Sequence, residues 1–100
     1  MLVKVTRKLV VEQLEKMLAG EASREDTGWW AYDLMLEEGL EYEPGCERLL
    51  ADVLRSLHYF HDTEPFMVQF YPETEELLYY LKCLRGDEFY QRSRVIHWRV

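Results

Sequence analysis

One segment of this chain repeats apolar side chains at the spacing of an α-helix. Between residues 44 and 61 they recur every three or four positions, at Leu49, Leu50, Val53, Leu54, Leu57 and Phe60. A short helix of this kind is stable only when other elements cover its apolar stripe, because isolated helices are marginal in water. The segment therefore predicts a core helix of a mainly helical domain.

Shorter apolar stripes predict three further helices. They lie near residues 6–19, 24–38 and 74–85. Ser23 is a suitable N-cap for the second of these, and Gly86 follows the end of the last. The 100 residues contain no internal repeat and no linker, so we expect a single domain, residues 1–100, with about four helices in one bundle-like arrangement.

Two segments are β-prone instead of helical. They are Phe66–Tyr71 and Arg94–Trp98, both rich in aromatic and β-branched residues. They are expected to be short extended pieces, or to pair as a small sheet. The alternative to a mainly helical domain is therefore an α+β fold, in which Leu2–Val5 also pairs.

The negative charge of the chain is concentrated in one stretch. Residues 21–47 hold nine acidic side chains and one basic one, Arg24, so this stretch alone carries −8 of a chain whose net charge is −7. The adjacent Trp29 and Trp30 lie inside it. An acidic field with large aromatic side chains suits the capture of a basic protein partner, whereas it repels nucleic-acid phosphates.

The predicted helix near residues 24–38 has two apolar faces. At 100° per residue, the first face, assigned to the core, holds Thr27, Trp30, Ala31 and Leu34. An acidic ridge of Asp26, Asp33 and Glu37 separates it from a second stripe of Trp29, Tyr32 and Leu36. The second stripe is either covered by the C-terminal segment or exposed for a partner. Gly28 is expected to weaken this helix locally.

The run from Leu18 to Ala31 resembles a pattern in small bacterial proteins of uncharacterised function, roughly L-x-G-E-x-S-R-E-E-x-x-x-W-A. The matching residues are Gly20, Glu21, Ser23, Arg24, Glu25, Trp30 and Ala31, with Asp26 in place of the second Glu. Some of those proteins resemble immunity proteins encoded near secreted toxins. The resemblance implies a similar helical fold and a role in inhibiting a toxin. Trp29, Gly28 and the tail after Gly86 have no counterpart in the pattern.

The sequence thus favours a protein-binding module, an immunity or antitoxin-like inhibitor of a basic effector such as a nuclease. Trp29 would anchor the partner because tryptophan side chains dominate interface energies. The partner-binding residues are expected to be Trp29, Tyr32, Asp33, Glu37, Glu38, Glu41 and Glu43.

Two alternatives use other parts of the chain. The segment 85–100 is basic, with Arg85, Arg92, Arg94 and Arg99 interleaved with aromatics, which suits a regulator that associates with nucleic acid. The simpler interpretation is that it folds back and pairs its charges with the acidic body. The second alternative is a homodimer with the extra apolar stripe as its seam.

The sequence contains no convincing catalytic or cofactor-binding motif, so we expect a protein that is not an enzyme and holds no cofactor or metal. His58, His61 and Asp62 have ligand-like spacing, but a zinc site needs about four ligands and a histidine suits a helix C-terminus. Cys46 and Cys83 are expected to be reduced thiols in apolar surroundings. Without a signal peptide or an apolar span, a cytoplasmic location is expected.

Overall fold

The computed structural model describes residues 3–95. Its α-helices and strands are β1 (Val3–Val5), α1 (Arg7–Leu18), α2 (Arg24–Met35), β2 (Leu40–Tyr42), α3 (Glu47–His58) and α4 (Thr74–Leu84). Three short 3-10 helices complete it, namely η1 (Tyr59–His61), η2 (Pro65–Phe70) and η3 (Arg92–Arg94). The mainly helical fold is confirmed, and each α-helix begins and ends within one turn of its predicted position.

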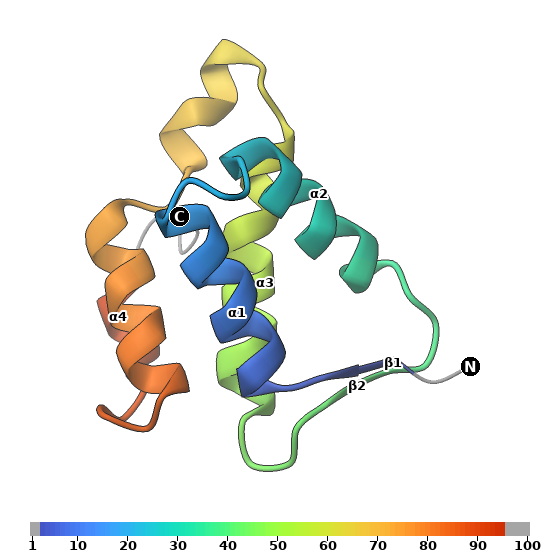
Figure 1. Ribbon diagram of the computed structural model, residues 1–100, viewed down its shortest axis with the longest axis vertical. Coiled ribbons are helices and arrows are strands. Elements are labelled where there is room, and N and C mark those ends of the chain that lie inside the picture. Colours follow the sequence, from blue (N-terminus) through green and yellow to red (C-terminus); the bar gives the residue numbers. More distant parts are fainter. Residues whose placement is uncertain (1–2, 96–100) are drawn as a thin grey trace.

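Helix α3 is the central element. It runs behind α1 in Figure 1, with α2 crossing on one side and α4 packed on the other. Every side chain of the apolar stripe between residues 44 and 61 is buried, with at most 7% exposed. The stripe is covered because α1, α2 and α4 each turn an apolar face toward it. Within residues 3–95, every helix falls short of the length and apolarity that a membrane-spanning segment needs.

A small parallel sheet closes one end of the molecule. Strand β1 pairs with β2, with Val3 opposite Leu40 and Val5 opposite Tyr42. Val5 is fully buried and belongs to the core. The expected pairing of the N-terminal segment is therefore present from Val3 onward, and its partner is the segment that follows α2 (Figure 1).

The extended structure predicted for Phe66–Tyr71 is wrong for residues 66–70, which belong to η2, and Tyr71 follows as the extended C-cap. Pro65 begins the turn, where its missing N–H costs no hydrogen bond. The N–H of Met67 donates to the carbonyl of Glu64 at 2.9 Å and closes the first turn. The sheet found within residues 3–95 consists of β1 and β2 alone. Of the other β-prone segment, Arg94 lies in η3, and residues 96–98 lie outside the described part of the chain.

Helix α2 crosses η1 at very close range, and Gly28 lies at the crossing. A Cβ atom built on Gly28 would lie 2.2 Å from the backbone nitrogen of His61 and 2.6 Å from the backbone carbon of Phe60. Those distances are far below van der Waals contact, so no side chain fits there. Gly28 was expected only to weaken α2 locally. Its lack of a side chain is what allows α2 to pack against η1.

Candidate protein-binding site on helix α2

Helix α2 begins at a capped N-terminus and turns one face into the core. The Ser23 hydroxyl accepts a hydrogen bond from the N–H of Asp26 at 2.9 Å, as an N-cap should. Thr27 and Ala31 are fully buried, and Trp30 and Leu34 pack against the core. These four residues are the predicted core face, and Gly28 adds a second buried position where α2 crosses η1.

Trp29 lies on the outward side and is 44% exposed. Its ring meets Tyr32 edge to face, with 5.6 Å between ring centroids and 86° between the planes. The other neighbour is His61 of η1, whose ring centroid lies 4.7 Å from that of Trp29 and 4.6 Å from that of Tyr32. Leu36, at the end of the stripe, is 64% exposed. The second apolar stripe is thus accessible at Trp29 and Leu36, whereas Tyr32 is half-buried.

If the C-terminal segment covers this stripe, Ile96 and Trp98 are the apolar side chains that would do so. Both lie outside the described residues. The part of the C-terminal segment that is described, up to Val95, packs elsewhere, against α3 and α4.

His61 supports Trp29 because its own ring is held in place. Its Nδ1–H donates to the backbone carbonyl of His58, and the His58 Nδ1–H donates to that of Arg55. Burial lowers the pKa of His58 below its ordinary value. Asp62, the third member of the possible metal cluster, accepts the N–H of Glu64 at 3.1 Å. Among residues 3–95, no three His, Cys, Asp or Glu side chains converge as metal ligands would.

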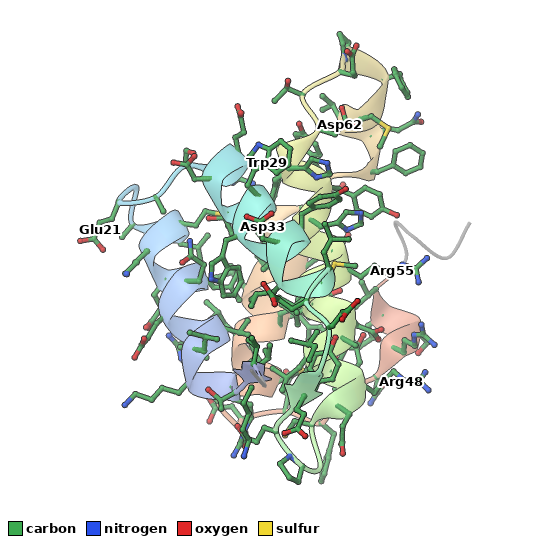
Figure 2. All side chains as sticks on the ribbon, turned by 90° about the vertical axis from the view of Figure 1, so that its right-hand side faces the viewer. Glu21, Trp29, Asp33, Arg48, Arg55 and Asp62 are labelled. Carbon is green, nitrogen blue, oxygen red and sulfur yellow. The ribbon has the colours of Figure 1, made fainter. Side chains whose placement is uncertain are left out.

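Exposed carboxylates surround Trp29 along the helix. Glu25 and Asp26 precede it by four and three residues, and Asp33 follows it by four, so all three lie on its side of α2. Figure 2 shows Trp29 and Asp33 on the same face of α2. Glu37 and Glu38 continue the charge into the turn after the helix. Within the described part of the chain, none of these five carboxylates forms an ion pair.

The other two predicted site residues serve a different purpose. Glu43 accepts the backbone N–H of Arg7 at 3.0 Å and its Nε–H at 2.8 Å. The backbone hydrogen bond from Arg7 is the main cause of the lowered pKa of Glu43. Glu41 is exposed but lies opposite Lys4 in the parallel register. The structure therefore places Trp29, Tyr32 and Asp33 on α2 and Glu37 and Glu38 in the turn that follows it, and leaves Glu41 and Glu43 with basic neighbours on the β1 side.

The C-terminal segment folds back, as the simpler interpretation expected, but onto a different surface. The Tyr90 hydroxyl donates to Asp52 Oδ2 at 2.5 Å, and Arg92 Nε lies 3.2 Å from the same oxygen. Asp52 is a buried residue of α3, only 3% exposed. Further ion pairs join Arg85 to Glu15 at 2.5 Å and Arg94 to Glu88 at 3.2 Å. None of these acidic partners belongs to residues 21–47, so the C-terminal arginines described here neutralise none of the carboxylates of that stretch.

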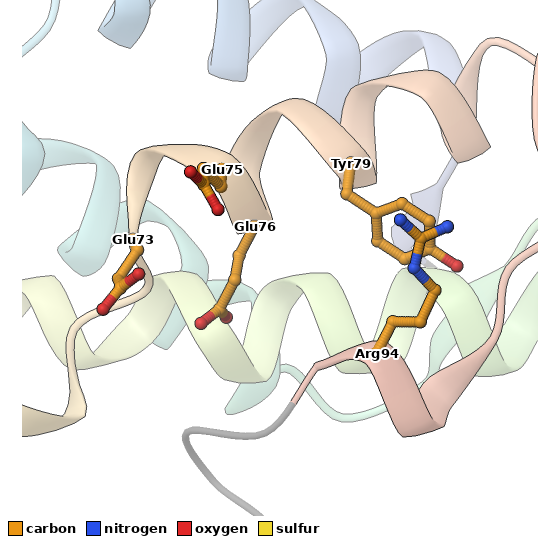
Figure 3. A pocket seen from close by; sticks show the side chains of 5 residues that line it. All are labelled: Glu73, Glu75, Glu76, Tyr79 and Arg94. Carbon is orange, nitrogen blue, oxygen red and sulfur yellow. The ribbon is translucent and has the colours of Figure 1, made fainter.

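A second candidate site is a pocket of about 230 Å³ beside α4 (Figure 3). The described side chains that line it are Glu73, Glu75, Glu76, Tyr79 and Arg94. The Arg94 guanidinium lies 4.3 Å from the centre of the Tyr79 ring. Burial and the charge of Glu73 raise the pKa of Glu76 to about 7. A carboxyl that titrates near neutrality suits proton transfer, but the described lining holds no histidine, serine or cysteine to act with it.

Two contributors to the α2 site escaped sequence reasoning in their present roles. The spacing of His61 suggests a metal ligand, but its ring packs against Trp29. Gly28 is a weak helix former, but it allows α2 to approach His61. Comparison of the chain with protein-family models, curated proteins and solved structures gives no match. The similarity of residues 18–31 to immunity-like proteins thus remains a prediction.

Proposed function

We propose that this protein binds a basic protein partner through the outer side of α2 and the turn that follows it, and inhibits that partner as immunity proteins and antitoxins do. The observation that carries the proposal is the surroundings of Trp29. A 44% exposed tryptophan lies among carboxylates that form no ion pair within the described residues. An exposed apolar surface with a charged rim is typical of protein–protein contact sites, and Trp29 and Leu36 supply exposed apolar side chains here.

The proposed mechanism has an electrostatic and an apolar step. The acidic field of residues 21–47 attracts Lys and Arg side chains and raises the association rate by about 10- to 1000-fold at low salt. Contact then buries the exposed part of Trp29, and water leaves the ring and the neighbouring Leu36. The exposed carboxylates act mainly on the association rate constant, whereas the buried Trp29 ring acts mainly on the dissociation rate constant. The two steps can therefore be measured separately.

A basic effector, such as a nuclease, is the partner class that this chemistry favours. An enzyme that acts on nucleic acid carries a cationic surface for phosphates, and an acidic face that covers this surface would block its substrate. The resemblance of residues 18–31 to immunity-like proteins supports the same proposal.

The nucleic-acid alternative finds less support. Arg85, Arg92 and Arg94 each form an ion pair with a carboxylate of the same chain. A phosphate would have to displace these carboxylates before it met the arginines. Little positive charge is therefore left on this segment, within residues 3–95, to attract a nucleic acid.

Charge reversal with a matched control tests the proposed function. Tagged wild type, Glu37→Lys and Asp87→Lys are used at low salt to capture proteins from a lysate of the source cell. Both variants change the net charge equally, but Asp87 is an exposed residue of the loop after α4, away from α2. We expect wild type and Asp87→Lys to retain the same basic protein, and Glu37→Lys to lose it. Equal retention by all three forms, or retention of further copies of the chain alone, would contradict the proposal.

A further inference from the structure

The contacts around Trp29 point to a particular side chain of the partner. We infer that the outward surface of the Trp29 ring binds an arginine guanidinium of the partner, which lies between the carboxylates of Asp26 and Asp33. This inference rests on the proposed function, and it names the chemistry at the centre of the interface. Arginine, and not lysine, is then the residue that the partner must offer at this position.

The ring is arranged for stacking because its mobility is restricted. Tyr32 packs edge-on against one part of it and His61 against another, at centroid distances of 5.6 and 4.7 Å. His61 is itself fixed by its hydrogen bond to the backbone of His58. A partner side chain therefore meets a ring that is already in position and loses little entropy in ordering it. The centroid distances also show that the three rings contact one another, so they do not enclose a cage for a cation.

The charges favour a planar cation with donors along its edges. Asp26 and Asp33 lie on the same side of α2 as Trp29, three residues before it and four residues after it. A guanidinium stacked on the indole directs its N–H groups outward in its own plane, toward carboxylates on both sides. A lysine ammonium is a compact, strongly hydrated charge that cannot stack in this way.

The chain makes the same type of contact within itself. The Arg94 guanidinium lies over Tyr79, 4.3 Å from the ring centre (Figure 3), and also pairs with the Glu88 carboxylate at 3.2 Å. The Arg24 guanidinium lies 5.2 Å from the centre of the Phe60 ring. Trp29 has the stronger cation-binding ring, yet among the described residues no arginine or lysine lies over it. In the proposed complex the partner supplies the cation for this ring.

The test uses two blocked peptides of equal length and charge, hexa-arginine and hexa-lysine. Binding is followed at low salt by the indole N–H signal of Trp29 in a two-dimensional nitrogen–proton NMR spectrum, which is assigned by its loss in Trp29→Leu. We expect hexa-arginine to bind about 3- to 5-fold more tightly than hexa-lysine and to shift the Trp29 signal. In Trp29→Leu this preference should disappear.

A second pair of variants leaves the aromatic packing untouched. Asp33→Asn and Asp87→Asn each remove one negative charge, and only the former lies beside Trp29. Asp33→Asn should weaken hexa-arginine binding more than Asp87→Asn does. Equal, salt-sensitive binding of both peptides, or an arginine preference that survives in Trp29→Leu, would overturn the inference and leave the proposed function standing. If neither peptide binds at low salt, both proposals fail.

Discussion

Two glutamates show how the fold changes the acidity of single residues in opposite directions. Glu43 receives the backbone N–H and the guanidinium of Arg7, which stabilise its ionised form and lower its pKa. Glu76 is partly removed from water close to Glu73, and its pKa rises to about 7. Both residues are glutamates in acidic stretches of the sequence, so only their surroundings distinguish them.

The raised pKa of Glu76 makes the stability of the protein depend on pH. The folded state keeps this proton to about pH 7, whereas the unfolded state releases it near pH 4.5, so the free energy of unfolding falls as the pH rises between these values. Glu76→Gln keeps a neutral side chain and should escape this loss. Between pH 5 and pH 8 the variant should gain on the order of 2 kcal/mol relative to wild type, as measured by urea unfolding.

The matched control for this measurement is Glu75→Gln. Glu75 is exposed on the same turn of α4 and lines the same pocket. This variant should follow the pH dependence of wild type. If Glu76→Gln and Glu75→Gln behave alike, the burial of Glu76 does not control its titration.

Residue patterns predicted the faces of α2 but not what covers them. Helical spacing placed Trp30 and Ala31 on the core side and Trp29 on a second stripe, and the structure agrees. Helical spacing did not predict that His61 would support the Trp29 ring. That contact joins residues 32 positions apart in the sequence, which meet only where α2 crosses η1. Contacts of this kind depend on how elements pack against one another. The spacing of apolar residues within one element contains no information about that packing.

At the scale of elements, the crossing of α2 and η1 decides the geometry of the candidate site. Two physical effects act on Gly28 with opposite signs. Glycine lowers the stability of a helix interior by about 1 kcal/mol relative to alanine, whereas a Cβ here would lie 2.2 Å from a backbone atom of η1. A backbone atom cannot move aside as the end of a flexible side chain can, so the steric effect is the larger one.

Gly28→Ala should therefore destabilise the protein, although it improves the helix propensity of α2. Overpacking typically costs about 1–3 kcal/mol, and the melting temperature should fall by roughly 10 °C in a domain of this size. Thermal unfolding followed by circular dichroism measures this change. A variant as stable as wild type would show that α2 and η1 are not so closely packed.

The prediction of elements succeeded where one apolar stripe faced the core. Such stripes located the four α-helices found within residues 3–95, since a stripe at helical spacing has few other ways to be buried. The prediction failed for residues 66–70, where aromatic and β-branched residues suggested a strand. Those residues form η2 because Pro65 begins a turn there, and sequence alone does not show whether a strand has a partner.

At the scale of the whole molecule, the fold separates its charges. The basic residues of segment 85–95 pair with carboxylates of α1, α3 and the loop after α4. Arg7 and Lys4 lie beside the carboxylates at the β1 end. The carboxylates around α2 thus keep their charge and, with Trp29 exposed among them, present one acidic and partly apolar face (Figure 2).

The decisive measurement is the association rate constant of this protein with its captured basic partner as a function of ionic strength. Between about 20 mM and 300 mM salt, the rate constant for wild type should fall at least about tenfold, because screening shortens the reach of the acidic face. Glu37→Lys should bind more slowly at low salt and approach wild type at high salt, while Asp87→Lys should follow wild type throughout. A rate constant that does not change with salt, or equal rates for Glu37→Lys and Asp87→Lys, would show that the acidic face of α2 does not guide the partner.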